Sequence, residues 1–479
     1  MQLTKRWMLP LCLIASCAPI VLAQVQAQGP EQTKQLALEI FKQLIEINTT
    51  DSVGNVTTAA EAMAKRLRDG GFSENDIKVA GPNDRKKNIV VRFQGTGKRK
   101  PILFIGHLDV VEARREDWTT NPFEFIEKDG YFYGRGTEDM KEGDAILVTN
   151  FIRLRKEGFQ PDRDLILAMT ADEEGGSSNG MDWLLKEHRG WIEAEYCINL
   201  DAGEFEKSKN NRLLAGIQAS EKVYVDYQFE SLNPGGHSSV PSPDNAIYHL
   251  AGALARLQSF AFPFKISEIT RNYFERTAAL TTGQISADLK AVAKQPPDVT
   301  AVQHLSAVPY YNSLLHTTCV ATMLSGGHAP NALPQTARAN VNCRIFPGED
   351  PQEILKTLER VANDPKVRVS IVAQFAPDGK QVPVVPVPPS PLLPEVTQAM
   401  EKTLAAAWPG VPLIATMSTG ATDGKYTRIA GIPTYGISCM FFEMNDSRAH
   451  GKDERVGVQD FYDGVEFNYK LIRELSTPR

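Results

Sequence analysis

The chain has 479 residues, of which 42% are hydrophobic and 23% are charged, and its formal net charge is −6. This composition is typical of a globular protein in water, and the length exceeds what one hydrophobic core usually spans, so we expect two domains. The sequence contains no long basic run, which argues against nucleic acid as a partner.

The first 23 residues have the pattern of an export signal. Two basic residues, Lys5 and Arg6, precede an apolar stretch that ends near Leu22, where small residues offer a cleavage site. The stretch is short and contains prolines, so we expect no transmembrane span in the mature protein. Ile-Ala-Ser before Cys17 also resembles a lipobox, which leaves lipid anchoring at Cys17 as an alternative. We predict an exported protein that is periplasmic or secreted.

Helical and strand-like patterns alternate between residues 31 and 200. Apolar residues at helical spacing predict helices, and short apolar runs between turn residues predict buried strands. The predicted helices cover 31–47, 57–68, 141–156 and 179–187, and the predicted strands cover 88–93, 101–106, 164–170 and 196–200. This alternation predicts a three-layer α/β domain.

The pattern changes after about residue 215. We expect strands at 222–230, 317–324, 337–345 and 367–375, a helix after residue 245 and another at 351–362. The order β-α-β-β-α-β is that of a small ferredoxin-like domain, and segment 258–312 is expected to be an irregular elaboration within it. After a Pro/Val-rich linker, α/β character resumes with a helix near 393–407 and strands near 413–415 and 434–437. We therefore predict a small domain, 216–378, inserted between two parts of a large domain, 31–215 and 379–479.

Cys319 and Cys343 lie symmetrically about a predicted connection between two strands. They could face each other, and an oxidising compartment would permit a disulfide between them. A bond between facing strands often has unfavourable geometry. We therefore favour two free thiols and keep the disulfide as the alternative.

Acidic and histidine side chains stand directly after several predicted strands, or in loops near them. In chain order they are His107, Asp109, Asp139, Glu173, Glu174, Asp201 and His450. In open α/β sheets, binding sites form at the carboxyl ends of the strands. Imidazoles and carboxylates are zinc ligands, and a carboxylate outside the ligand set can transfer protons. The pattern therefore predicts a metal-assisted active site.

The motifs around these residues resemble those of the M20 metallopeptidases, over nearly all of the chain after the signal. They are Gly106-His-Leu-Asp-Val-Val111, Gly134-Arg-Gly-Thr-Glu-Asp139, Asp172-Glu-Glu-Gly175, Asn199-Leu-Asp-Ala-Gly203 and His450. That family contains carboxypeptidases, dipeptidases and aminoacylases with two cocatalytic zinc ions. The resemblance implies a three-layer α/β catalytic domain with an inserted ferredoxin-like lid domain.

The resemblance also implies a role for each residue of the motifs. One zinc ion is held by His107, Asp139 and Asp201, and the other by Asp139, Glu174 and His450. Cobalt or manganese fits the same ligands. Asp109 accepts a hydrogen bond from His107 and fixes its tautomer. Glu173 is the general base, which takes a proton from the metal-bound water and passes it to the leaving amine.

The small domain and a late loop contribute further candidates by resemblance. His237, in Asn233-Pro-Gly-Gly-His, matches a lid histidine that stabilises the oxyanion, commonly across a dimer interface. Asn331 matches a substrate-contacting position, and the guanidinium of Arg344 suits the terminal carboxylate of the substrate. The loop Ser418-Thr419-Gly420 matches one that lines the substrate cleft.

We therefore expect an exported, zinc-dependent, exo-acting peptidase, either a dipeptidase or a carboxypeptidase, that hydrolyses short peptides. An amidohydrolase that removes N-acyl groups from amino acids would use the same metals and is the main alternative. A peptide-binding protein that keeps the fold without catalysis is a further alternative, against which the intact Glu173 argues. A homodimer through the lid domain is implied by the resemblance alone.

Overall fold

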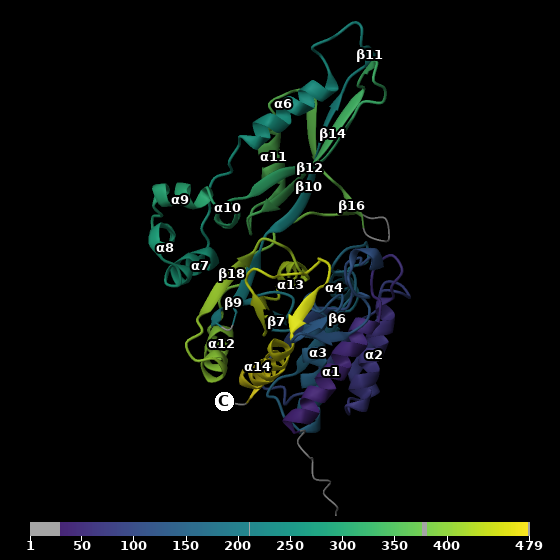
Figure 1. Cartoon of the computed structure of the whole chain (residues 1–479), viewed down its shortest axis with the longest axis vertical. Coiled ribbons are helices and arrows are strands. Elements are labelled where there is room, and N and C mark those ends of the chain that lie inside the picture. The colour runs from purple at the N-terminus through teal and green to yellow at the C-terminus, as the bar shows by residue number, and fades with distance from the viewer. Residues whose placement is uncertain (1–28, 210, 376–380, 478–479) are drawn as a thin grey trace, which may run out of the picture.

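The protein consists of a large and a small domain in the computed structural model, which describes residues 29–209, 211–375 and 381–477 (Figure 1). The small domain extends away from the large one, and the chain passes from the large domain into the small one and back. The expected signal, including Cys17, lies outside the described residues. Among those residues, we find no helix whose length and apolarity would let it cross a membrane.

The large domain is built on a mixed sheet of ten strands. The order is β1-β2-β6-β3-β7-β19-β9-β8-β20, and β18 pairs with β9 outside this order. The strands are β1 (Ile77–Ala80), β2 (Asn88–Phe93), β3 (Ile102–His107), β6 (Leu165–Thr170), β7 (Tyr196–Asn199), β8 (Phe205–Ser208), β9 (Asn211–Glu221), β18 (Leu413–Ser418), β19 (Thr434–Gly436) and β20 (Phe441–Glu443). Strands β6, β3 and β7 are parallel neighbours, so their carboxyl ends lie at the same edge of the sheet.

Helices cover both faces of this sheet and give the three layers that the sequence predicts. Side chains alternate along β3, where Phe104 packs into one layer and Leu103 and Ile105 pack into the other. The first layer contains α1 (Pro30–Glu46), α2 (Val56–Asp69), α3 (Lys141–Lys156), α12 (Pro394–Ala407) and α14 (Val458–Ser476). The second contains α4 (Gly180–Glu187), α5 (Arg189–Ile192) and α13 (Gly424–Ile429).

A small sheet near the carboxyl edge joins two loops that are distant in sequence. Its strands are β4 (Ile126–Lys128), β5 (Tyr131–Tyr133) and β21 (Arg455–Gly457), in the order β21-β5-β4. Since β5 precedes Asp139 and β21 follows His450, their pairing brings the two segments together. Two short 3₁₀ helices lie in other connections, η1 (Glu74–Asp76) between α2 and β1 and η2 (Arg115–Asp117) between β3 and β4.

The small domain has the predicted ferredoxin-like fold. Its elements are β10 (Val223–Leu232), α6 (Ala246–Gln258), β12 (Thr318–Gly326), β14 (Thr336–Ile345), α11 (Pro351–Ala362) and β15 (Val367–Ile371). The antiparallel sheet has the order β12-β14-β10-β15, so β12 is an edge strand. Two short ribbons extend it, β11 (Gly236–His237) with β13 (Ala332–Leu333) and β16 (Gln374–Phe375) with β17 (Gln381–Val382).

The expectation of an irregular segment at 258–312 was wrong. Most of it forms four helices, α7 (Glu268–Ala278), α8 (Gly283–Val292), α9 (Val299–Ser306) and α10 (Pro309–Leu315). Breakers such as Gly283 and Pro309 divide the segment into short pieces, so no long helical period is visible in the sequence. Buried residues of these helices, such as Phe274 and Leu289, join the core of the large domain.

The preference for free thiols at Cys319 and Cys343 was also wrong. The two cysteines form a disulfide that joins the edge strand β12 to β14. They stand directly opposite each other in the strand register, so their side chains leave the same face of the sheet at the same level. The bond fixes the position of the edge strand in the small domain.

Candidate metal centre

The carboxyl edge of the large sheet gathers the five predicted metal ligands. His107 ends β3, and Glu174 and Asp201 follow closely after β6 and β7. Asp139 stands just before α3, and His450 lies in the loop between β20 and β21. The parallel strands therefore bring together side chains that the sequence places far apart.

The carboxylate of Asp139 lies between two histidines. Nε2 of His107 is 3.0 Å from Oδ1 of Asp139 and 3.5 Å from Oδ1 of Asp201. Nε2 of His450 is 3.1 Å from Oδ2 of Asp139 and 2.9 Å from Oε2 of Glu174. Each oxygen of Asp139 thus faces a different histidine, which is the arrangement expected of a carboxylate that bridges two metal ions.

The electrostatics of this cluster favour positive charge. Burial alone would lower the pKa of His107, but the carboxylates of Asp201 and Asp139 raise it well above the usual value. Hydrogen bonds to Asp139 and Glu174 raise the pKa of His450 to about 10. Burial works to raise the pKa of Asp139, and the two histidines nevertheless hold it well below its usual range. Protons and metal ions compete for the same lone pairs, so the same potential favours a cation.

Glu173 lies beside the cluster. Its carboxylate belongs with His107 and Asp201 to a group whose ligand atoms lie within 4.8 Å of one another, while His107, Asp139 and Glu174 form a second such group. Burial and the neighbouring charge of Asp201 raise the pKa of Glu173 well above its usual value. A raised pKa makes this carboxylate a better proton acceptor, as general-base catalysis at neutral pH requires.

Asp109 makes contacts that differ from the expected hydrogen bond. Nδ1 of His107 is 3.0 Å from the main-chain oxygen of Asp109 and 3.9 Å from its carboxylate. The carboxylate instead accepts the main-chain N–H groups of Glu173, at 3.1 Å, and Glu174, at 3.0 Å. Asp109 thus orients His107 through its backbone and holds the Glu173–Glu174 turn through its side chain.

Glu454 is a buried residue of the site that the sequence did not reveal. Its carboxylate accepts the main-chain N–H groups of Gly136, Glu138 and Asp139, at 3.1, 2.7 and 3.1 Å. The guanidinium of Arg135 pairs with the same carboxylate. Glu454 therefore fixes the loop that carries Asp139. Its only signal in the sequence is a place in a charged run after His450, a pattern more typical of a solvated surface.

The structure does not bring His237 to the metal cluster of its own chain. His237 lies on β11, at the end of the small domain that points away from the large sheet (Figure 1). It is exposed, and Nδ1 is 2.7 Å from Oγ of Ser239. Asn331 is its neighbour, because the main-chain oxygen of Asn331 accepts the N–H of Ser238 at 3.0 Å.

Arg344 lies at the opposite end of the small domain, where the chain enters from the large sheet. It stands opposite Tyr224 in the register of β14 and β10, and its guanidinium lies 4.7 Å from the centre of that ring. The predicted loop Ser418-Thr419-Gly420 begins at the end of β18 nearby, since the oxygen of Ser418 accepts the N–H of Lys222 at 3.0 Å. The substrate-binding candidates thus divide between the two ends of the small domain.

Comparisons with known proteins agree with this architecture. The sequence pattern of peptidase family M20/M25/M40 matches residues 103–474. The probable carboxypeptidase S-like 2 of Dictyostelium discoideum is 28% identical over 406 residues, which are 81% of this chain and 74% of that protein. The N-fatty-acyl-amino acid synthase/hydrolase PM20D1 of Homo sapiens is 27% identical over 399 residues, with 79% and 74% covered.

A solved structure shares the fold. The M20 family metallo-carboxypeptidase Sso-CP2 from Sulfolobus solfataricus superposes with a TM-score of 0.67 at 16% identity, covering 92% of this chain and 99% of that one. The family match extends from β3 to the last helix and includes all five predicted metal ligands. The chain therefore belongs to peptidase family M20/M25/M40, the metallohydrolases that act on peptide and amide bonds.

Proposed function

We propose that the protein is a two-zinc, exo-acting peptidase, a dipeptidase or carboxypeptidase that hydrolyses short peptides. The supporting observation is the position of Asp139, whose two oxygens face His107 and His450 separately. Asp201 completes the ligand set on one side and Glu174 on the other. Oε1 of Glu174 is buried and has no hydrogen-bond partner among the described residues, which fits a ligand atom whose partner is an ion.

The donor set fits zinc. It consists of two imidazoles and three carboxylates, with one carboxylate shared, and cobalt or manganese accepts the same donors. When bound, such ions polarise the scissile carbonyl and make a water molecule more acidic. The negative potential of the cluster, which raises the pKa of His450 to about 10, also attracts them.

Side chains of the protein transfer the proton and bind the substrate. Glu173 takes a proton from the attacking water and passes it to the nitrogen of the leaving amine. Arg344 binds the terminal carboxylate of the substrate through its guanidinium. The loop Ser418-Thr419-Gly420 lines the cleft beside it.

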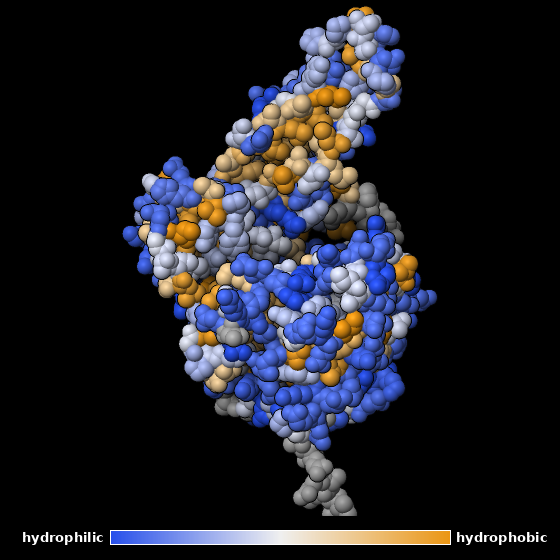
Figure 2. Space-filling model, in the orientation of Figure 1, coloured by the Kyte–Doolittle hydropathy of each residue, from blue (hydrophilic) through white to orange (hydrophobic). Residues whose placement is uncertain are grey.

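We propose that the protein acts as a homodimer, because His237 and Asn331 lie at the distal end of the small domain. The edge strand β12 exposes Val320, Met323 and Leu324, with 61%, 72% and 72% of their surface accessible. Together with α6 it borders an apolar groove of about 910 Å³, and Figure 2 shows apolar surface over the small domain. A second copy paired along this edge would cover the apolar surface, and its His237 would serve the metal cluster of the first.

Hydrolysis of N-acyl amino acids is a second candidate function. It is favoured by the 27% identity to PM20D1, whose name describes an N-fatty-acyl-amino acid hydrolase. In both reactions an amide bond breaks and an amino acid with a free carboxylate leaves. The metal cluster and Glu173 serve both equally, so the acyl side of the substrate decides between them.

Export is also part of the proposal. The disulfide between Cys319 and Cys343 supports it, because such bonds form and persist in oxidising compartments. Removal of residues 1–23 and lipid attachment at Cys17 are distinguished by the mass of the mature N-terminus.

A substrate panel tests the function. The mature, zinc-loaded protein is assayed with dipeptides and with N-acyl amino acids, before and after treatment with a chelator. We expect dipeptide hydrolysis that the chelator abolishes and zinc restores. Hydrolysis of N-acyl amino acids alone would favour the second candidate, and no hydrolysis of any amide would contradict both.

A further inference from the structure

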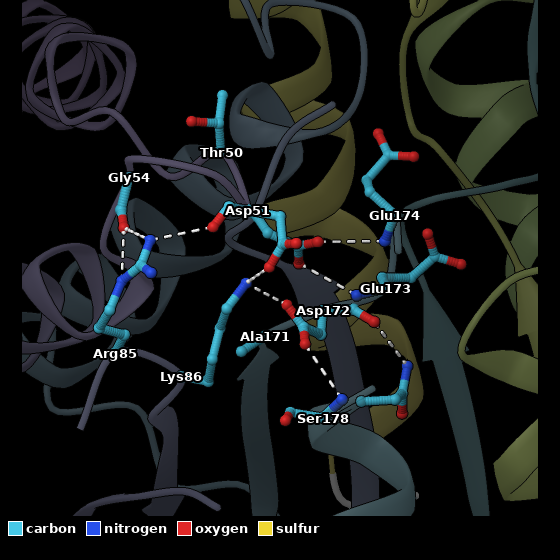
Figure 3. A network of polar contacts seen from close by, with 12 residues as sticks. Thr50, Asp51, Gly54, Arg85, Lys86, Ala171, Asp172, Glu173, Glu174 and Ser178 are labelled. Atoms are coloured by element: carbon cyan, nitrogen blue, oxygen red, sulfur yellow. Dashed lines mark hydrogen bonds and ion pairs between the residues drawn. The ribbon is translucent and has the colours of Figure 1, made fainter. Parts of the chain in front are cut away.

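A buried lysine stands behind the turn that carries Glu173 and Glu174. Nζ of Lys86 pairs with Oδ1 of Asp172, the residue directly before Glu173, and lies 2.8 Å from Oδ1 of Asp51 (Figure 3). Only 8% of the Lys86 side chain and 2% of the Asp172 side chain are accessible. Burial alone would lower the pKa of Lys86, but Asp172 and Asp51 raise it, so the lysine carries its charge.

Asp172 has an unusual backbone conformation. Its φ is +58°, in the left-handed region that residues other than glycine rarely adopt. Side-chain and main-chain bonds hold it there, since Oδ2 accepts the N–H of Ser178 at 3.1 Å and its main-chain oxygen accepts Nδ2 of Asn179 at 3.2 Å. The loop closes tightly over the carboxylate, because a Cβ on Gly176 would lie 2.5 Å from Oδ2. This backbone angle sets the direction in which the next two residues leave β6.

The turn is thus held from two sides. Asp109 accepts the N–H groups of Glu173 and Glu174, and Lys86 binds the side chain of Asp172. Figure 3 shows the carboxylates of Glu173 and Glu174 pointing away from Lys86, so the lysine contacts neither of them. Its effect on them passes through Asp172.

Lys86 also connects the turn to a loop near the metal centre. Asp51 belongs to the connection between α1 and α2, and the next residue, Ser52, donates from its N–H and Oγ to the carboxylate of Glu112, both at 2.9 Å. Glu112 follows the segment that carries His107 and Asp109. The network therefore joins the segments after β3 and after β6 around one buried cation.

We infer that Lys86 is a positioning residue for the reaction: its pairing with Asp172 fixes the turn that aims Glu173 and Glu174 at the metal cluster. This role rests on the proposed function, in which Glu173 is the base and Glu174 a ligand. A shift of about 1 Å in such groups costs about 100-fold in rate. Lys86 contributes without touching substrate or metal.

The test replaces Lys86 by methionine, which keeps an unbranched side chain of nearly the same length and removes its charge. For Lys86→Met we expect kcat to fall about 10- to 100-fold while KM changes little, because the geometry of the base changes and the substrate contacts remain. We also expect a lower zinc content by elemental analysis, since Glu174 shares the turn. Lys86→Arg, which preserves the charge, should recover most of both values.

A neighbouring lysine provides the matched control. Lys87→Met makes the same chemical change one residue away, where Nζ lies 4.0 Å from the exposed Asp84 and contacts neither Asp51 nor Asp172. Its kcat and zinc content should equal those of the wild type. The double variant Lys86→Met/Asp172→Asn removes the carboxylate that the single change leaves unpaired, so it tests the role even where Lys86→Met does not fold.

The outcomes separate the two proposals. Wild-type kcat and full zinc content in the folded single or double variant would overturn the positioning role and leave the proposed function intact. A wild-type protein that hydrolyses no amide would overturn the proposed function and with it the role of Lys86 in the reaction, and loss of zinc from Lys86→Met would then support only that Lys86 positions Glu174 as a ligand. Reduced kcat and zinc content with rescue by arginine would support both.

Discussion

The metal centre and the distal end of the small domain are organised in opposite ways. At the metal centre, side chains from separate strand ends and loops are already in contact, and residues such as Asp109 and Glu454 fix the segments that carry them. At the distal end, His237 is exposed and contacts Ser239 of its own loop. The comparison teaches that the predicted metal ligands already meet within one chain, whereas the proposed role of His237 requires a second chain.

The largest expected effect comes from removing the proposed general base beside the metal centre. Glu173→Gln should lower kcat by about 10²- to 10⁴-fold, because it removes the proton acceptor without removing a ligand. Zinc content, measured by elemental analysis, should remain at two ions per chain. Glu187→Gln, an exposed residue at the end of α4, is the matched control and should leave kcat unchanged. Normal turnover by Glu173→Gln would exclude Glu173 as the base.

The next effect concerns the distal end of the small domain. His237→Ala should lower kcat by about 100-fold, the usual loss for a donor that stabilises an oxyanion. Because His237 is exposed and far from the cluster, the melting temperature and the zinc content should not change. A loss of zinc in this variant would instead place His237 among the ligands of the metal centre.

A smaller effect is expected where the small domain joins the large one. Arg344→Met should raise KM by about tenfold or more with a lesser change in kcat, because the guanidinium binds the substrate carboxylate before and during the reaction. Arg338→Met on the same strand removes a guanidinium that pairs with Glu230, and its KM should equal that of the wild type. Equal KM values for both variants would exclude Arg344 from substrate binding.

The disulfide should affect stability more than activity. The double variant Cys319→Ser/Cys343→Ser opens a link across 24 residues, and this should lower the free energy of unfolding by about 2–4 kcal/mol. Denaturant unfolding measures the change, and reduction of the wild type should reproduce it. An unchanged midpoint would mean that the packing of β12 on β14 alone holds the edge of the small domain.

The parts of the fold that depend on local pattern were predictable from the sequence. The strands that end at His107 and precede Glu173 and Asp201 are short apolar runs, and the split β-α-β-β-α-β order follows from similar signals. Helices α7–α10 were not predictable, because glycines and prolines break them into pieces too short to show a helical period.

Contacts between distant segments could not be predicted either. Glu454 bonds to main-chain groups more than 300 residues earlier, and Lys86 pairs with a residue 86 positions later. Neither has a motif of its own, since each acts by holding a loop whose conformation only the folded chain defines. The hydrogen bonds of the Asp109 carboxylate differ from the expected bond to His107 for the same reason. The carboxylate accepts N–H groups of the turn after β6, the strand beside β3 in the sheet.

A heterodimer of two inactive variants tests the central claim most directly. One chain carries Glu173→Gln and the other His237→Ala, and the heterodimer is purified through two different affinity tags. If each site combines the metal centre of one chain with His237 of the other, one of the two sites is intact, and about half of the wild-type kcat per dimer should return. If the heterodimer is as inactive as its two parent homodimers, His237 acts within its own chain, and the division of the site between two chains is contradicted.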